Sequence, residues 1–101
     1  MILHIVTFAW VEDADPTIVA EIPVALRAMA AQLPMLSSYS CGANLHLRPG
    51  GADFAVIAEV TTKADLDAYL DAPAHIELIE RLVSKILKSR QAVQLETSLA
   101  S

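Results

Sequence analysis

Apolar and polar residues follow two different periods along this 101-residue chain, and the periods separate strands from helices. Four stretches alternate, or are apolar and β-branched throughout, as buried strands are: 2–11, 36–41, 54–61 and 91–96. Three others repeat apolar residues at helical spacing: Pro16 to about Gln32, Thr62 to Leu70, and Pro73 to about Ser89. A turn at Gly42 and Asn44, a loop at 45–53 and a frayed tail over 98–101 complete the prediction.

Prolines and short polar side chains mark where these helices begin. Asp15 before Pro16 is typical of an N-cap followed by proline in the first turn, and Thr62 with Asp65 resembles a capping box. Pro23 lies inside the first helical pattern, which predicts either a kink just before it or a helix that begins later. Pro73 predicts a break in the second helical region.

The element order is β-α-β-β-α-β, which favours an α+β domain with a four-stranded antiparallel sheet and both helical regions on one face. The other face needs cover as well. Its apolar candidates are Leu3, Ile5, Val11, Ile57 and Val93. A second copy of the same sheet is the simplest cover, so we expect a homodimer through the sheet faces.

Composition supports this expectation and removes several classes of function. Hydrophobic residues make up 54% of the chain, more than one small core needs, and the net charge is −5. Nucleic acid is therefore not an expected partner, and the basic residues of 81–90 are interpreted as complementing a helix C-terminus. We expect no export signal, no membrane span, and a cytoplasmic location. The lone Cys41 gives no disulfide or zinc pattern and is expected to be an inert buried thiol.

The candidate chemistry collects around the predicted break at Pro73. Tyr69 precedes the break and His75 follows it, so a turn at 71–73 would bring phenol and imidazole to one pocket. His4 lies on the inward face of the first strand. Each has a structural interpretation as well: a helix-start histidine, a packing tyrosine and a satisfied core histidine. His46 is expected at the surface, and no histidine pair has metal-ligand spacing, so neither metal nor cofactor is expected.

Several of these residues together carry a resemblance to a known family, the stress-responsive dimeric α/β-barrel proteins. The matching segments are Ile2 to Val6, Leu33 to Leu36, Ser38-Tyr39 with Gly42 and Asn44, and Tyr69 with Pro73-Ala74-His75. The resemblance covers residues 1–97 and implies ferredoxin-like protomers whose sheets form a dimeric barrel, with a cavity between sheet and helices in each protomer.

The resemblance also implies roles for individual residues. In a plant polyketide cyclase of this family, the last histidine of a His-Pro-Ala-His motif acts as base, assisted by a tyrosine six residues earlier and a histidine near the N-terminus; these match His75, Tyr69 and His4. The motif's first histidine is Ala72 here, and Gln94 or Glu96 corresponds to an acidic residue on the last strand. The expected walls of the cavity are Trp10, Leu26, Val56 and Ala58.

Two functions of different class follow. In the first, the protein binds an apolar or aromatic carbonyl compound and acts as a cyclase or lyase with His75 as general base. In the second, it is a stable, stress-associated dimer without catalytic activity. A cavity of roughly 300 Å³ with converging polar groups would favour the first.

Overall fold

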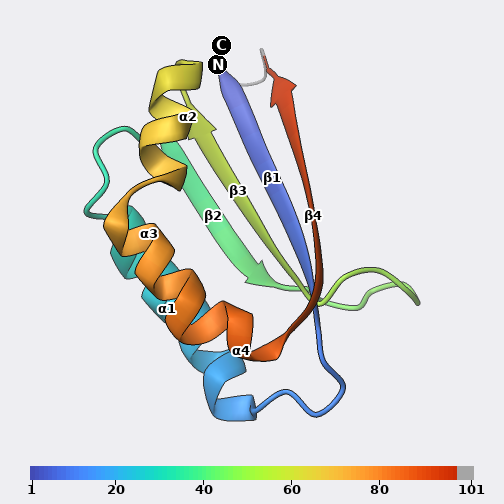
Figure 1. The fold of residues 1–101 in the computed structure, drawn as a ribbon. Helices are drawn as coiled ribbons and strands as arrows, with labels where there is room; N and C mark the ends of the chain where they lie inside the picture. The colour runs from blue at the N-terminus through green and yellow to red at the C-terminus, as the bar shows by residue number, and fades with distance from the viewer. Residues whose placement is uncertain (98–101) are drawn as a thin grey trace.

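The computed structural model describes residues 1–97, which form one four-stranded antiparallel sheet with helices packed on one face (Figure 1). The elements in chain order are β1 (Ile2–Trp10), α1 (Pro16–Ala30), β2 (Ser38–Ala43), β3 (Phe54–Val60), α2 (Lys63–Leu70), α3 (Pro73–Leu78), the π-helix η1 (Ile79–Val83), α4 (Ser84–Ile86) and β4 (Leu87–Glu96). The strand order is β2-β3-β1-β4. The predicted ferredoxin-like β-α-β-β-α-β fold is confirmed, and the tail predicted at 98–101 lies outside the described residues.

Local signals place the helix ends correctly. Asp15 accepts a hydrogen bond from the Thr17 N–H at 2.9 Å, and Thr62 Oγ1 accepts one from the Asp65 N–H at 3.1 Å. The α1 helix runs without interruption from Pro16 through Pro23, so a later start is wrong. Because helix α2 ends at Leu70 and α3 begins at Pro73, the predicted break is confirmed.

Strand pairing moves two boundaries away from their predicted positions. Strand β2 begins at Ser38 rather than residue 36 and continues through Gly42, where a turn was expected, because it pairs with β3 to its end. The last helix ends at Ile86, and β4 begins at Leu87 rather than Gln91. The helix gives way to a strand here because β4 pairs with β1. A 2.8 Å hydrogen bond from the Val11 N–H to the Ile86 carbonyl holds the junction. The basic residues of 81–90 were predicted to lie at the end of a helix. Two of them, Lys88 and Arg90, therefore lie on a strand instead.

The core lies between the helices and the inner face of the sheet. The inner face is defined by residues that stand opposite one another on the four strands, since directly paired residues share a face. One cross-sheet row is Tyr39-Ala58-His4-Gln94, and another is Ala43-Phe54-Phe8-Arg90. The helices contribute the buried residues Ile22, Leu26, Met29, Leu78, Leu82, Val83 and Ile86.

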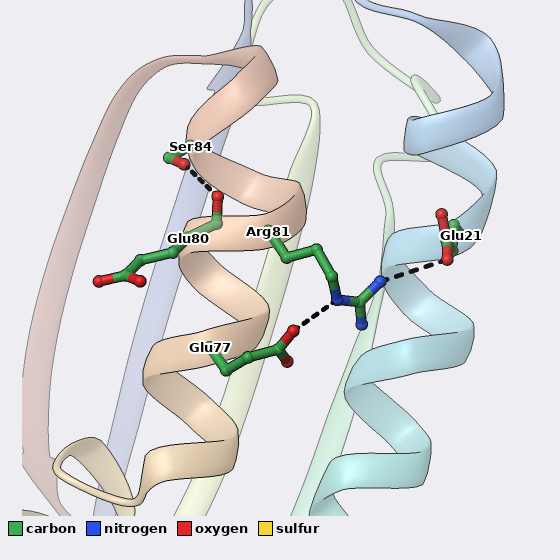
Figure 2. A network of polar contacts seen from close by, with 5 residues as sticks. All are labelled: Glu21, Glu77, Glu80, Arg81 and Ser84. Carbon is green, nitrogen blue, oxygen red and sulfur yellow. Dashed lines mark hydrogen bonds and ion pairs between the residues drawn. The ribbon is translucent and has the colours of Figure 1, made fainter.

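Arg81, on η1, links its own helical segment to α1 at the protein surface (Figure 2). Its Nε donates to Glu77 Oε1 at 2.7 Å, and its Nη1 lies 3.5 Å from Glu21 Oε1 on α1. Nearby, the Ser84 hydroxyl donates to the Glu80 carbonyl at 2.8 Å. All three charged side chains are about half exposed, and exposed ion pairs contribute only about 0–1 kcal/mol. Apolar packing therefore holds the helical layer on the sheet.

The outer face of the sheet carries none of the helices described within residues 1–97 (Figure 1). Its central apolar residues are exposed: Ile57 by 41%, Val93 by 47% and Leu95 by 46%. Leu3 and Ile5 stand opposite Leu95 and Val93 in the register, so they belong to the same band. Val11, predicted for this face, lies beyond β1 and packs against the core instead.

Candidate functional site

A cavity of about 300 Å³ lies between the helices and the inner face of the sheet. Its walls are mainly aliphatic and aromatic: Val6, Phe8, Trp10, Ile22, Leu26, Val56, Leu70, Ile79, Val83 and Leu87. Five polar side chains complete the lining: His4, Tyr39, Tyr69, His75 and Arg90. An apolar chamber with a few polar groups has the character of a small-molecule site.

The three residues predicted to carry chemistry reach this cavity from three different elements. His4 comes from β1, Tyr69 from α2 and His75 from α3. The ring centroids of Tyr69 and His75 are 4.9 Å apart, and those of His4 and Tyr69 are 6.3 Å apart in an edge-to-face arrangement. The turn between α2 and α3 therefore brings phenol and imidazole side by side.

The predicted wall residues are placed differently from one another. Trp10, Leu26 and Val56 line the cavity, but Ala58 does not. Ala58 is 0% exposed and lies in the sheet between His4 and Tyr39, its partners on the two neighbouring strands. These two larger side chains, rather than the Ala58 methyl group, border the open space.

The helix break gives His75 its orientation. A helix that ends at Leu70 and is followed by Pro73 leaves the Leu70 carbonyl without its usual backbone donor. His75 Nδ1 lies 3.1 Å from that oxygen, and because a carbonyl only accepts, Nδ1 carries the hydrogen. Nε2 of the neutral ring is then free to accept a proton. Burial lowers the pKa of His75, the Arg90 charge lowers it further, and the bond to Leu70 opposes the change.

His4 has the opposite hydrogen-bonding state. The Gln94 side-chain amide donates to His4 Nδ1 at 2.8 Å, which leaves the hydrogen of the neutral ring on Nε2. Burial lowers the pKa of His4, followed by the charges of Arg90 and His75. Gln94, one of the two residues considered for the acidic position on the last strand, therefore contacts His4. Glu96 is exposed opposite Ile2 at the end of the sheet.

Tyr39 is a cavity residue to which the sequence prediction gave no role. Its hydroxyl is buried and has no hydrogen-bond partner among residues 1–97. The Tyr69 phenol lies beside it, with ring centroids 6.3 Å apart in an edge-to-face arrangement. Burial raises the pKa of both phenols, and the proximity of Tyr69 raises that of Tyr39 further. The alternation of 36–41 does place Tyr39 on one face of β2, but it does not say which face points inward.

Arg90 is the second residue that was missed, because the predicted helix extended almost to it. The register places Arg90 opposite the buried Phe8, on the inner face of β4. It is exposed, so it lies where the cavity meets solvent. Only the strand pairing of β4 reveals this position.

The remaining chemically reactive side chains lie outside the cavity. His46 is exposed, with a positive φ of 52°, and Cys41 is a half-buried free thiol whose pKa is raised by burial. Within residues 1–97 no three His, Cys, Asp or Glu side chains gather in a way that would hold a metal ion. None of the helices described has the length and apolar character to cross a membrane.

The fold and the cavity define a ferredoxin-like protein with a chamber of about 300 Å³ between its helices and its sheet. The family described as the Stress Responsive A/B Barrel Domain matches residues 2–97, and the chain belongs to this family. A comparison with curated proteins finds no match.

Solved structures agree with the family assignment. A dimeric ferredoxin-like protein of unknown function from Thermobifida fusca YX is 34% identical, with a TM-score of 0.87 over 95% of this chain and 90% of that chain. A dimeric ferredoxin-like protein from Bacteroides fragilis is 22% identical, with a TM-score of 0.82 over 95% of both chains. A hydroxynitrile lyase from Passiflora edulis is 14% identical, with a TM-score of 0.80 over 97% of this chain and 94% of that chain. At this low identity, the last two show similarity of fold alone.

Proposed function

We propose that this protein is a cytoplasmic homodimer that binds a small apolar or aromatic carbonyl compound and acts on it as a cyclase or lyase. The observation that carries the proposal is the convergence of His4, Tyr69 and His75 on one largely apolar cavity of about 300 Å³. Such a volume suits a small aromatic molecule. The lowered pKa of His75 supports the proposal, because a neutral imidazole is available as a base near pH 7.

In the proposed reaction, His75 Nε2 removes a proton from the carbon beside a substrate carbonyl. The hydroxyl of Tyr69 donates to the enolate oxygen that forms, and His4 orients the substrate through its Nε2–H. In a cyclase, the enolate carbon then attacks a second carbonyl carbon and forms the ring bond. The proton held by His75 passes to the new alkoxide oxygen, so the base is regenerated.

The homodimer is proposed from the outer face of the sheet. This face exposes an aliphatic band that includes Ile57, Val93 and Leu95, and two solved relatives are described as dimeric. Pairing of two such sheets would bury the band in the way that sheet-on-sheet packing does.

The test is turnover of a defined poly-β-keto substrate, with an aromatic cyanohydrin as the lyase substrate. Replacing the base in His75→Ala should lower kcat about 100-fold or more, and Tyr69→Phe should lower it about tenfold. His46→Ala is the matched control, because His46 is exposed and does not line the cavity. Unchanged rates in both cavity variants would overturn the catalytic proposal and support a stable, stress-associated dimer without activity.

A further inference from the structure

The cavity has an unbalanced charge. Among its lining residues, Arg90 is the one side chain with a permanent charge, and no aspartate or glutamate lines the space. Burial favours the neutral forms of both histidines and both tyrosines, as the directions of their pKa shifts indicate. A single uncompensated positive charge is therefore present at neutral pH.

Nothing else in the described structure neutralises this guanidinium. The ion pairs of residues 1–97 involve Lys63 and Arg81, and Arg90 takes part in none of them. Its positive charge contributes, after burial, to the lowered pKa values of His4 and His75 in the cavity. Arg90 lines the cavity together with both histidines, so its donors are placed where a bound ligand can reach them.

The register explains why the charge is at the mouth of the cavity. Arg90 shares a cross-sheet row with Phe8 and Phe54, and Phe8 stacks on Trp10 with ring centroids 5.5 Å apart. Phe8 and Trp10 line the cavity as well. An aromatic surface and a guanidinium therefore lie next to each other, as recognition of an amphipathic anion requires.

We infer that the ligand of this cavity is an apolar or aromatic carboxylate, whose carboxylate binds Arg90 while its apolar body lies against Phe8 and Trp10. This rests on the proposed function and adds the substrate class. A guanidinium matches a carboxylate through two parallel hydrogen bonds. A phosphate ester would bring close to two negative charges to a lining that offers one cation, so the monoanion is favoured.

The experiment compares two probes of the same shape by isothermal titration calorimetry, the anion 2-naphthoate and the neutral 2-naphthamide. We expect the wild-type protein to bind the carboxylate about tenfold more tightly at low ionic strength, as one exposed charge-assisted contact would give. Arg90→Gln should bring the affinity ratio to about one without changing the affinity for the amide. Arg90→Lys should retain part of the preference, because it keeps the charge but loses the planar pair of donors.

Lys88→Gln is the matched control, since it removes one positive charge from the same strand at a residue that does not line the cavity. Its affinity ratio should equal that of the wild type. Equal wild-type affinities for the two probes, or equal effects of Lys88→Gln and Arg90→Gln, would overturn the assignment of Arg90 and leave the cavity as a ligand site. Failure of the wild-type protein to bind either probe would count against the proposed function itself.

Discussion

The two faces of the sheet are built from the same four strands but have different chemistry. On the inner face, His4, Tyr39 and Arg90 stand among buried apolar residues and border a cavity. On the outer face, Ile57 and Val93 are exposed, and none of the helices in the described part of the chain covers them (Figure 1). Because side chains alternate along each strand, one register fixes both faces at once. The inner face is thus suited to a small ligand and the outer face to a second protein surface.

The largest effect is expected on the outer face. Ile57→Asp places a charge in the centre of the aliphatic band, so pairing of two sheets would bury an uncompensated carboxylate. We expect the dimer dissociation constant to rise at least about 100-fold, on the order of 3 kcal/mol. Size-exclusion chromatography with light scattering measures the change.

Val24→Asp is the control for this substitution, because Val24 is 66% exposed on α1, in the helical layer. It should leave the assembly unchanged. A wild-type protein that is monomeric at micromolar concentration, or a dimer that persists in Ile57→Asp, would show that the outer face does not form the interface.

The second effect is a pH dependence of stability that arises on the inner face, where His4 and His75 have lowered pKa values. In the pH range just below 6.5, the unfolded chain binds protons at His4 and His75 that the folded chain does not. The contribution of these two histidines to the free energy of unfolding should therefore be at its maximum above about pH 6.5. It should be lost as the pH decreases through the pKa values of the folded protein. Urea denaturation between pH 7.5 and 5 measures this dependence.

Variants assign the pH dependence to the cavity. His75→Gln should reduce the loss of stability at low pH, whereas His46→Gln should not, because His46 is exposed in the loop before β3. If the two variants and the wild type showed the same pH profile, the cavity histidines would not be its source.

The smallest effect concerns a single hydroxyl group. Tyr39→Phe removes a buried donor that has no partner among residues 1–97, and we expect the protein to gain about 1 kcal/mol of stability. The same change should weaken binding of a carbonyl ligand that the hydroxyl would contact. Thermal unfolding with and without 2-naphthoate measures both effects. Destabilisation of the ligand-free protein would mean that the Tyr39 hydroxyl is already satisfied.

Local sequence signals were sufficient for the break that positions Tyr69 and His75. Pro73 cannot continue the hydrogen bonding of α2, so the turn and the approach of the two rings follow from the residues of that segment. The inward direction of His4 follows in the same way from alternation along β1. The family resemblance added the expectation of a cavity, which the residue pattern alone does not give.

Arg90 and Gln94 could not be assigned from the sequence for a physical reason. Their roles depend on which residue of β1 stands opposite each of them, Phe8 for Arg90 and His4 for Gln94, and pairing between residues so far apart in the sequence leaves no local signal. The start of β4 at Leu87 has the same origin, because pairing with Trp10 ends the preceding helix. Ala58 lies on the inner face of the sheet, as predicted. It does not line the cavity because the larger side chains of its neighbours His4 and Tyr39 do so instead.

The opposite tautomers of His4 and His75 have a consequence for stereochemistry. His4 reaches the cavity from the sheet and holds its ring hydrogen on Nε2, whereas His75 reaches it from the helical layer and holds its ring hydrogen on Nδ1. A planar carbonyl compound lying between these layers would meet a proton acceptor on one side and a donor on the other. A reaction in this cavity that creates a chiral centre is therefore expected to give an excess of one enantiomer.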